Sequence, residues 1–427
     1  MPLPQNARLD TALLHAGHEA DPATGSLAVP IYQTSAYEFR DAQHAVNLFS
    51  LKEKGNIYSR IMNPTNDAFE KRIAALEGGV GALSFASGHA AIVGAICNIA
   101  QAGDEIVSSP TLYGGTYNVF LRTLTRMGIK VNFAEGNDPQ SLARAITPGT
   151  KAVFAETVGN PKSDVLDIEN AAKAAHAAGV PLIVDATFTV YLGRAIEFGA
   201  DVVVHSATKF IDGHGSSMGG VVVDAGKFDY GSGKFPLMSD PDPSYHNLKF
   251  SDLGKLAYIT RLRTQIMRDM GACLSPFHSF LFIRGLETLH LRMERHSRSA
   301  LAVARHLEGH KRVSWVSYPG LASHPDHALA LKYMPSGAGA ILSFGAAGGR
   351  EAGHRFIKAL RLFSHAANIG DARSLVIHPA STTHSQLTPD QQLSTGTTDD
   401  LIRLSIGLED IKDILSDLDT ALDAAGE

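Results

Sequence analysis

The stretch Val202-Val-Val-His-Ser-Ala-Thr-Lys-Phe-Ile-Asp-Gly-His-Gly215 is the most informative part of this 427-residue sequence. It begins with the β-branched run Val202–Val204, which is typical of a strand buried on both faces in a parallel sheet. Lys209 follows the run, and ligands of open α/β sheets bind outside the carboxyl ends of the strands. Partial burial there lowers the pKa of a lysine and favours its nucleophilic amine, while Ser206 and Thr208 are short donors that suit phosphate oxygens. Taken alone, the segment also fits a surface lysine that follows a strand.

The chain around this segment alternates strand-like and helix-like stretches from about residue 65 to residue 225. Helical stretches over Ala90–Ala100, Tyr117–Met127 and Ala171–Ala178 separate short apolar runs. Such alternation predicts an α/β fold with a mostly parallel sheet between helices. The expected strands are Gly81–Ala86, Glu105–Ser108, Ile129–Phe133, Ala152–Ala155, Leu182–Val184, Val202–Val204 and Gly220–Val223.

The two flanks differ from this central region. The N-terminal segment is rich in turn residues and aromatics without a strong period, so we expect an irregular arm that lies on another surface, such as a neighbouring subunit. Residues 226–250 are a Pro/Gly-rich loop or insertion, and Leu253–Leu307 is dominantly helical. Shorter strands return from Val313 onward, which predicts a smaller C-terminal α+β domain. The expected division is an N-terminal arm over 1–64, a large domain over 65–270, and a C-terminal domain with a linking helix over 271–427.

Composition and charge exclude several classes of function. The chain is 44% hydrophobic and 19% charged, its net charge is −5, and no stripe of Lys and Arg marks a nucleic-acid surface. The N-terminal residues lack the layout of a secretory signal, and no apolar run reaches the length of a membrane span. Cys97 and Cys273 cannot make a disulfide framework, so we expect both to be structural and the protein to be cytoplasmic.

Three further segments place chemically useful groups at the ends of strands or the starts of helices. The run Leu182–Val184 ends in Asp185, a carboxylate that suits the protonated pyridine nitrogen of a pyridoxal cofactor, or that caps the next turn. Ser87-Gly88-His89 follows another strand and begins a helix, where backbone N–H groups and the helix dipole favour a phosphate. Ser-Gly turns are common, so this signal is weak by itself. Tyr113, followed by two glycines, either stacks on the cofactor ring or packs in the core.

Two other motifs are set aside. Gly215-Ser-Ser-Met-Gly219 has the spacing of a nucleophile elbow, but a strand follows it where that elbow requires a helix, so we expect no serine hydrolase. None of the 19 histidines forms the His-Glu-x-x-His pattern of zinc enzymes. We expect no bound metal, and loop positions for His324, His327, His378 and His384.

In this order, the four segments resemble the Cys/Met-metabolism family of fold-type-I pyridoxal-phosphate enzymes, and the resemblance covers nearly the whole chain. Ser206-Ala-Thr-Lys209-Phe-Ile-Asp-Gly-His-Gly is similar to the family's lysine signature. The resemblance implies a large domain with a mostly parallel seven-stranded sheet between helices, and a smaller C-terminal α+β domain. It also implies that Lys209 holds pyridoxal 5'-phosphate as a Schiff base, and that Lys209 and Tyr113 are catalytic.

The resemblance extends to other residues of the site. Tyr58-Ser-Arg60 is similar to a family segment that reaches the phosphate of a neighbouring subunit's cofactor, which implies a homotetramer built from dimers with shared active sites. Arg403 matches the arginine that binds the α-carboxylate of the substrate, and Ser374 and Tyr58 are implied beside it. The implied cofactor-binding set is Ser87, Gly88, His89, Tyr113, Asn160, Asp185, Thr187, Ser206, Thr208, Lys209, Tyr58 and Arg60.

Within the family, several segments resemble the O-acetylhomoserine sulfhydrylases, among them Leu14-His-Ala-Gly-His and Asn368-Ile-Gly-Asp-Ala-Arg-Ser. The resemblance implies a transferase of methionine biosynthesis that replaces the acetate of O-acetyl-L-homoserine with sulfide or a thiol, giving L-homocysteine or methionine. Three alternatives stay open: an enzyme of O-succinylhomoserine (a sulfhydrylase or a cystathionine γ-synthase), a lyase that cleaves a Cγ–S bond, and a non-enzymatic binding protein. Gly114-Gly115 argues against the lyase, because methionine γ-lyases carry a Gly-Cys pair there.

The sequence departs from the family pattern beside the expected cofactor ring. Ala186 stands where the family usually has asparagine, and the turn over 187–192 is one residue shorter and lacks its proline. We expect this change to reshape the floor of the active site. Arg373 also replaces a lysine common in the subgroup, which keeps the charge and alters its geometry. These residues do not decide the acyl group on homoserine or the sulfur donor.

Overall fold

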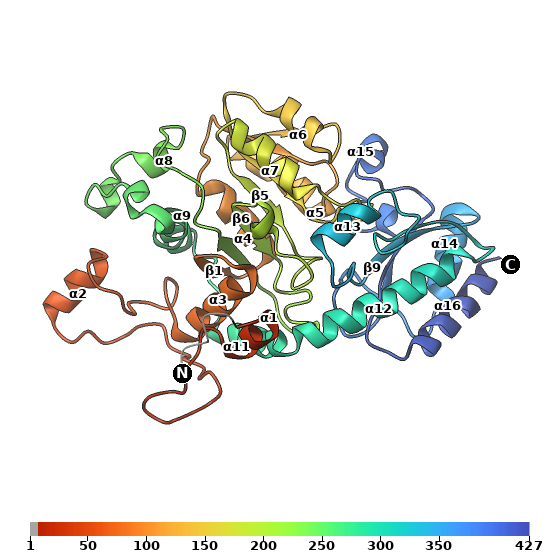
Figure 1. The fold of residues 1–427 in the computed structure, drawn as a ribbon, viewed down its shortest axis with the longest axis horizontal. Coiled ribbons are helices and arrows are strands. Elements are labelled where there is room, and N and C mark those ends of the chain that lie inside the picture. Colours follow the sequence, from red (N-terminus) through yellow and green to blue (C-terminus); the bar gives the residue numbers. More distant parts are fainter. Residues whose placement is uncertain (1–6, 427) are drawn as a thin grey trace.

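A seven-stranded sheet forms the centre of the large domain in the computed structural model, which describes residues 7–426 (Figure 1). The strand order is β1-β7-β6-β5-β4-β2-β3, and among these strands β7 alone runs antiparallel to its neighbours. The predicted, mostly parallel sheet is therefore confirmed. The strands are β1 (Gly81–Phe85), β2 (Glu105–Ser108), β3 (Lys130–Phe133), β4 (Thr150–Glu156), β5 (Leu182–Asp185), β6 (Val202–His205) and β7 (Gly220–Asp224).

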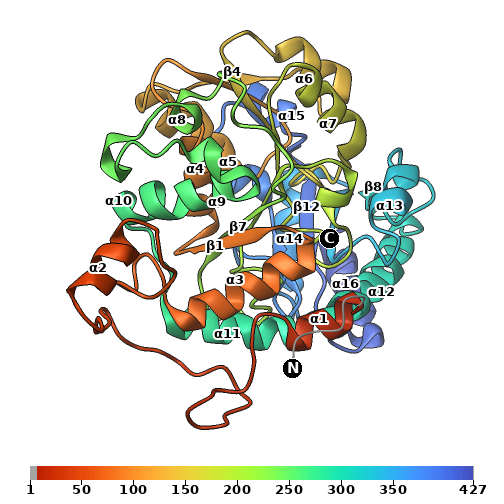
Figure 2. The same cartoon turned by 60° about the vertical axis from the view of Figure 1, so that its left-hand side comes forward.

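Helices cover both faces of this sheet, as predicted (Figure 2). Along β6 the side chain of Val203 belongs to one apolar cluster, whereas Val202 and Val204 belong to another, because successive residues of a strand point to opposite faces. The first cluster includes α3 (Pro64–Glu77), α6 (Pro139–Ala145), α7 (Ile168–Ala177) and α11 (Pro276–Glu287); the second includes α4 (Gly88–Cys97), a π-helix over Val119–Leu124 that continues α5 (Gly114–Asn118), and α9 (Ala257–Arg261).

The N-terminal arm is more regular than the sequence indicates. It contains α1 (Leu9–His15) and α2 (Ala42–Phe49), and α2 lies at the end of an excursion away from the body of the molecule (Figures 1 and 2). The expectation of an irregular arm is wrong for these two segments, because helices this short show no clear period. The Pro/Gly-rich segment over 226–250 likewise contains α8 (Pro236–Ser239) and a 3₁₀ turn over Pro243–Tyr245.

The helical connection to the second domain consists of several pieces. A 3₁₀ segment (Phe250–Leu256), α9, a π-helix (Leu262–Met267) and α10 (Arg268–Met270) precede α11 and the 20-residue α12 (Leu289–Glu308). Leu289 and Met293 of α12 pack in the first apolar cluster of the large domain, whereas Val303 and Leu307 pack in the core of the C-terminal domain. Helix α12 therefore joins the two cores.

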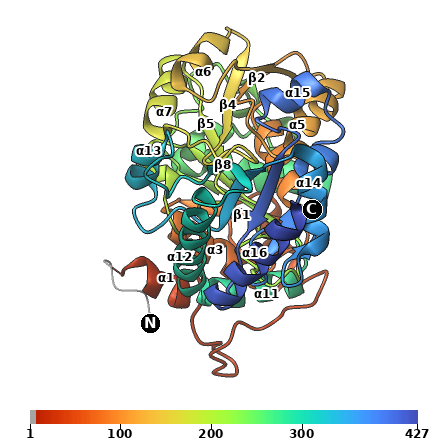
Figure 3. The same cartoon turned by 90° about the vertical axis from the view of Figure 1, so that its right-hand side faces the viewer.

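The C-terminal domain has the smaller α+β architecture that was predicted. Its five-stranded sheet has the order β10-β11-β12-β9-β8, and α14 (Gly349–Ala359) and α16 (Ile411–Ala425) pack together over it with α12 (Figure 3). Among residues 7–426, no helix has the length and apolar character that a bilayer crossing requires. The remaining elements are β8 (Val313–Ser317), β9 (Ile341–Ala346), β10 (Ser364–His365), β11 (Leu375–Ile377), β12 (Leu401–Ser405), α13 (His327–Tyr333) and α15 (Pro389–Ser394).

Candidate active site

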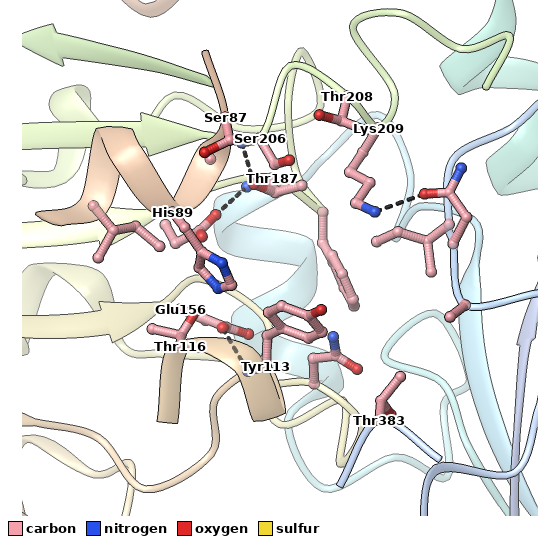
Figure 4. A pocket seen from close by; sticks show the side chains of 18 of the residues that line it. Ser87, His89, Tyr113, Thr116, Glu156, Thr187, Ser206, Thr208, Lys209 and Thr383 are labelled. Atoms are coloured by element: carbon pink, nitrogen blue, oxygen red, sulfur yellow. Dashed lines mark hydrogen bonds between the residues drawn. The ribbon is translucent and has the colours of Figure 1, made fainter. Parts of the chain in front are cut away.

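A cavity of about 210 Å³ lies where the carboxyl ends of β4, β5 and β6 meet loops of the C-terminal domain (Figure 4). This is the edge of the sheet at which ligands of open α/β folds bind. Most of the predicted site residues line it, namely Ser87, Gly88, His89, Tyr113, Asn160, Asp185, Thr187, Ser206, Thr208, Lys209 and Arg403.

Lys209 lies in the turn that follows β6, and its side chain points into the cavity (Figure 4). Its ammonium Nζ donates to Oδ1 of Asn368 at 2.6 Å. Burial, followed by the positive charge of Arg403, lowers the pKa of Lys209 to about 8. A substantial fraction of the amine is therefore neutral, and nucleophilic, near neutral pH.

Asp185 is the last residue of β5, and its carboxyl is half-buried at the cavity wall. Its Oδ1 accepts a hydrogen bond from the backbone N–H of Thr187 at 2.9 Å, and the Thr187 hydroxyl in turn accepts from the N–H of Ser206 at 2.8 Å. These contacts tie the turn after β5 to the turn that carries Lys209. Burial raises the pKa of Asp185, and no ion pair neutralises this carboxyl among the described residues.

The N-terminus of α4 forms one wall of the cavity. The Ser87 hydroxyl caps the helix by accepting from the N–H of Ala90 at 3.1 Å. A Cβ added to Gly88 would lie 2.8 Å from Cβ of Ser206, so only glycine allows this close approach. Free N–H groups of the helix terminus and the hydroxyls of Ser206 and Thr208 therefore converge on one place that suits an anion.

Two stacked rings stand across the cavity from Lys209. The rings of His89 and Tyr113 lie 5.7 Å apart at an angle of 23°, and both are at the cavity wall (Figure 4). The N–H of Tyr113 donates to Oε1 of Glu156 at 2.7 Å. Burial and the nearby Asp185 raise the pKa of Glu156 well above its usual range, and its hydrogen bond fixes the position of the Tyr113 backbone.

The groups around the cavity match the functional groups of pyridoxal phosphate. A partly deprotonated lysine suits an aldehyde, a buried carboxylate suits a ring nitrogen, and the Gly88 cradle suits a phosphate. In addition, the buried Nε2 of His89 has no hydrogen-bond partner in the part of the chain that is described, so this nitrogen is available to a polar group of a ligand.

Arg403 enters the cavity from β12 of the C-terminal domain and is buried. Its Nη1 donates to Oδ1 of Asn160 at 3.0 Å and its Nη2 to the carbonyl of Asn368 at 3.4 Å, and within residues 7–426 it has no ion pair. Burial lowers the pKa of Arg403 to about 10. A buried guanidinium that contacts only neutral oxygens is suited to a carboxylate ligand.

Ser374 is not where the resemblance implied. Its N–H and hydroxyl both bond to Glu409, at 2.7 and 2.9 Å, and it does not line the cavity. Ser374 directly precedes β11, whereas Asn368 in the loop before it contacts both Lys209 and Arg403. The prediction for Ser374 is therefore wrong, and Asn368 takes that place.

Tyr58 and Arg60 also lie outside the cavity of their own chain. Nη1 of Arg60 donates to the carbonyl of Arg268 at 2.8 Å, its guanidinium lies 5.5 Å from the Tyr58 ring centre, and 43% of Tyr58 is exposed. Their role at a neighbouring subunit's site stays a prediction, since one chain does not test it.

The altered turn after Asp185 contributes Thr187 and Phe188 to the cavity wall. Ala186 is fully buried, belongs to the core and does not reach the cavity, whereas Phe188 lines it. The cavity also has lining residues that the sequence did not single out, among them Glu156, Phe188, Met218, Asn368 and Thr383. For Asn368 a signal was available, because this polar residue stands alone among apolar neighbours in Ala366-Ala-Asn-Ile369.

The comparisons with known proteins agree with this geometry. A family model described as Cys/Met metabolism PLP-dependent enzyme matches residues 10–423. The homocysteine synthase of Schizosaccharomyces pombe is 54% identical, with 99% of each chain covered. The O-acetyl-L-homoserine sulfhydrylase of Leptospira meyeri is 52% identical, with 98% of each chain covered. The O-acetyl-L-homoserine sulfhydrylase 1 of Thermus thermophilus is 49% identical, with 97% of this chain and 100% of that one covered.

A solved structure from Campylobacter jejuni, named as an O-acetylhomoserine (thiol)-lyase, superposes with a TM-score of 0.95 at 38% identity. The match covers 98% of this chain and 100% of that one, and that protein contains an N'-pyridoxyl-lysine-5'-monophosphate residue.

Proposed function

The chain belongs to the Cys/Met metabolism PLP-dependent enzyme family. We propose that, as a member of this family, it catalyses γ-replacement on O-acetyl-L-homoserine. Sulfide or a thiol replaces the acetate on Cγ, and the product is L-homocysteine or, with methanethiol, methionine. One observation carries the proposal. A nucleophilic lysine and a buried, unpaired guanidinium both bind Asn368, so one small amino acid can reach both at once.

The cofactor, when bound, supplies an electron sink that stabilises negative charge developing at Cα and Cβ of the amino acid. Asp185 would hold the proton on its ring nitrogen, because a carboxylate whose hydrogen-bond partner is neutral favours a cation beside it. The α4 N-terminus with Ser206 and Thr208 would hold the phosphate. These residues keep the cofactor in place while the substrate is exchanged.

Lys209 would carry protons during the reaction. Its amine lies where it would remove a proton from Cα of the bound amino acid and later move a proton at Cβ. Its lowered pKa, about 8, suits both directions of transfer near neutral pH. Arg403 would bind the α-carboxylate and so orient the Cα–H bond toward Lys209.

Tyr113 would act at the face opposite Lys209. Its ring stacks with His89 and lines the cavity, and its position is fixed through Glu156. There it can stack on the cofactor ring and, through its hydroxyl, donate a proton to the leaving acetate or accept one from the thiol.

The assembly and the location of the protein are part of the same proposal. The excursion of the arm around α2 and the position of Tyr58 and Arg60 outside their own cavity support a homotetramer of dimers in which these two residues complete a neighbouring site. The biosynthetic names of the relatives support a cytoplasmic location.

The test is a substrate panel with the purified, cofactor-loaded protein. We expect homocysteine and acetate from O-acetylhomoserine and sulfide, with less product from O-succinylhomoserine. Ammonia and a 2-oxo acid formed without added thiol would instead establish a lyase, and product from the succinyl ester alone would reassign the acyl donor. No turnover by a protein that retains the cofactor would contradict the proposal.

A further inference from the structure

Helix α12 contacts both halves of the active site at one point along its length. Arg292 and His296 lie one turn apart on it and are both buried. Arg292 lies in the part of the helix that packs in the large-domain core, and His296 lies between that part and the part in the C-terminal core. Neither side chain lines the cavity, and neither has a place in the chemistry described above. We refer to this pair as the α12 link.

Arg292 binds the backbone next to the cofactor lysine. Its Nη1 donates to the carbonyl of Phe210, the residue after Lys209, at 2.8 Å, and its Nη2 donates to the carbonyl of Gly285 at 2.7 Å. Arg292 has no ion-pair partner within residues 7–426, and burial lowers its pKa to about 10. A buried cation held by carbonyl oxygens is unfavourable for stability alone, which points to a positional role.

His296 binds both halves. Its ring packs edge-on against the ring of Phe210, with centres 5.6 Å apart at 82°, and its Nδ1 donates to the carbonyl of Ile406 at 2.7 Å. Ile406 directly follows β12, three residues after Arg403. Burial lowers the pKa of His296 to about 4, so the ring remains neutral and Nδ1 keeps the donor role.

A third contact closes the arrangement. Gly370 has a φ of +71° and lies against Phe210, so that a Cβ added to Gly370 would be only 2.8 Å from the Phe210 nitrogen. The N–H of Gly370 donates to the Ser405 hydroxyl at 3.0 Å. Phe210, the residue after Lys209, is therefore held through its carbonyl by Arg292 and through its ring by His296. Of these two, His296 also binds Ile406, directly after the strand of Arg403, and Gly370 packs closely between Phe210 and Ser405 of that strand.

We propose that Arg292 and His296 are positioning residues, which set the distance and orientation of Lys209 in the large domain relative to Arg403 in the C-terminal domain. The inference rests on the proposed function in one respect, that Lys209 and Arg403 bind the same amino acid. It predicts that damage to the link weakens the binding of the substrate carboxylate and leaves the cofactor's attachment unchanged, since the residues that hold the cofactor belong to the large domain.

The experiment compares His296→Phe with His296→Asn. Phenylalanine keeps a ring against Phe210 and loses the donor to Ile406, whereas the amide of asparagine can replace Nδ1 as that donor. Two unreactive ligands are titrated against the cofactor-loaded proteins by visible absorbance. These are L-norvaline, which has an α-carboxylate, and n-butylamine, the same molecule without it.

We expect His296→Phe to raise the Kd of norvaline about tenfold, the effect of one misaligned charge-assisted hydrogen bond, and to leave the Kd of butylamine unchanged. His296→Asn should recover most of the norvaline affinity. If His296→Phe does not fold, Arg292→Lys, which keeps the charge and loses the two-pronged contact, should give the same carboxylate-selective loss at a smaller size.

Val303→Ala is the matched control, because Val303 is buried on the same helix but two turns away in the C-terminal core. It should lower the melting temperature of the cofactor-free protein without changing the affinity for either ligand. Equal losses for norvaline and butylamine in His296→Phe, or no loss for either, would overturn the proposal. Since neither ligand needs sulfide or an acyl group, this outcome is independent of whether homocysteine is formed.

Discussion

The two halves of the cavity bury charges of opposite sign. The large-domain half contains Asp185, an acid at a strand end, and the C-terminal half contains Arg403, a guanidinium on β12. Each has only neutral partners among the described residues, although a buried charge without a counter-ion is strongly unfavourable. A ligand of the first half must therefore supply a cation, and a ligand of the second half must supply an anion. A protonated pyridine ring and an α-carboxylate meet these two requirements.

The largest effect is expected from neutralising the acid in the large-domain half. Asp185→Asn removes the counter-charge of the ring nitrogen, so we predict a fall of about 10² to 10³ in kcat, the size typical of losing one preorganised electrostatic group. Steady-state kinetics on protein matched for cofactor content measure it. The control is Asp224→Asn, a buried acid of β7 at the opposite edge of the same sheet, which should leave kcat unchanged. Equal losses in both variants would show that the effect is one of folding.

A smaller and different effect is expected in the C-terminal half. Arg403→Lys keeps a positive charge and loses the planar fork, so we predict that KM for the amino-acid substrate rises about 10-fold to 100-fold. The visible absorbance of the bound cofactor should not change, because no cofactor-holding group is altered. Loss of the cofactor in this variant would contradict the claim that the C-terminal half binds the substrate and not the cofactor.

The smallest effect concerns the pH at which the cofactor-free protein captures pyridoxal phosphate. Only the neutral amine of Lys209 reacts with the aldehyde, and its pKa is lowered to about 8 by burial. The capture rate should therefore rise about tenfold per pH unit below pH 8 and level off above it. In stopped-flow measurements, a rise that continues toward pH 10 would show that the amine is not buried in the way described.

The same two halves differ in how far the sequence predicts them. Asp185, Ser206 and Lys209 stand at or shortly after the ends of apolar runs, and the ends of parallel strands meet at one edge of a sheet, so pattern alone brings them together. Arg403 was placed by resemblance only. Asn368 was missed and Ser374 misplaced, because a loop conformation decides which of them faces the cavity.

The α12 link could not be predicted from the sequence, because its contacts join residues far apart in the chain. Arg292 and Phe210 are 82 residues apart, and His296 and Ile406 are 110 residues apart, so no local period relates them. Buried Arg and His on a helix are also indistinguishable by pattern from polar residues on a solvated face.

The assignment of Lys209 as the cofactor's lysine is tested most directly by finding which lysine carries the cofactor. The purified protein is reduced with borohydride, digested, and analysed by mass spectrometry, with Lys209→Ala treated in parallel. We predict one modified peptide, the one that contains Lys209, and no modified peptide and no visible absorbance in the variant. A pyridoxyl group on any other lysine of the wild-type chain, or an unaltered spectrum in Lys209→Ala, would contradict the assignment of this cavity as the active site.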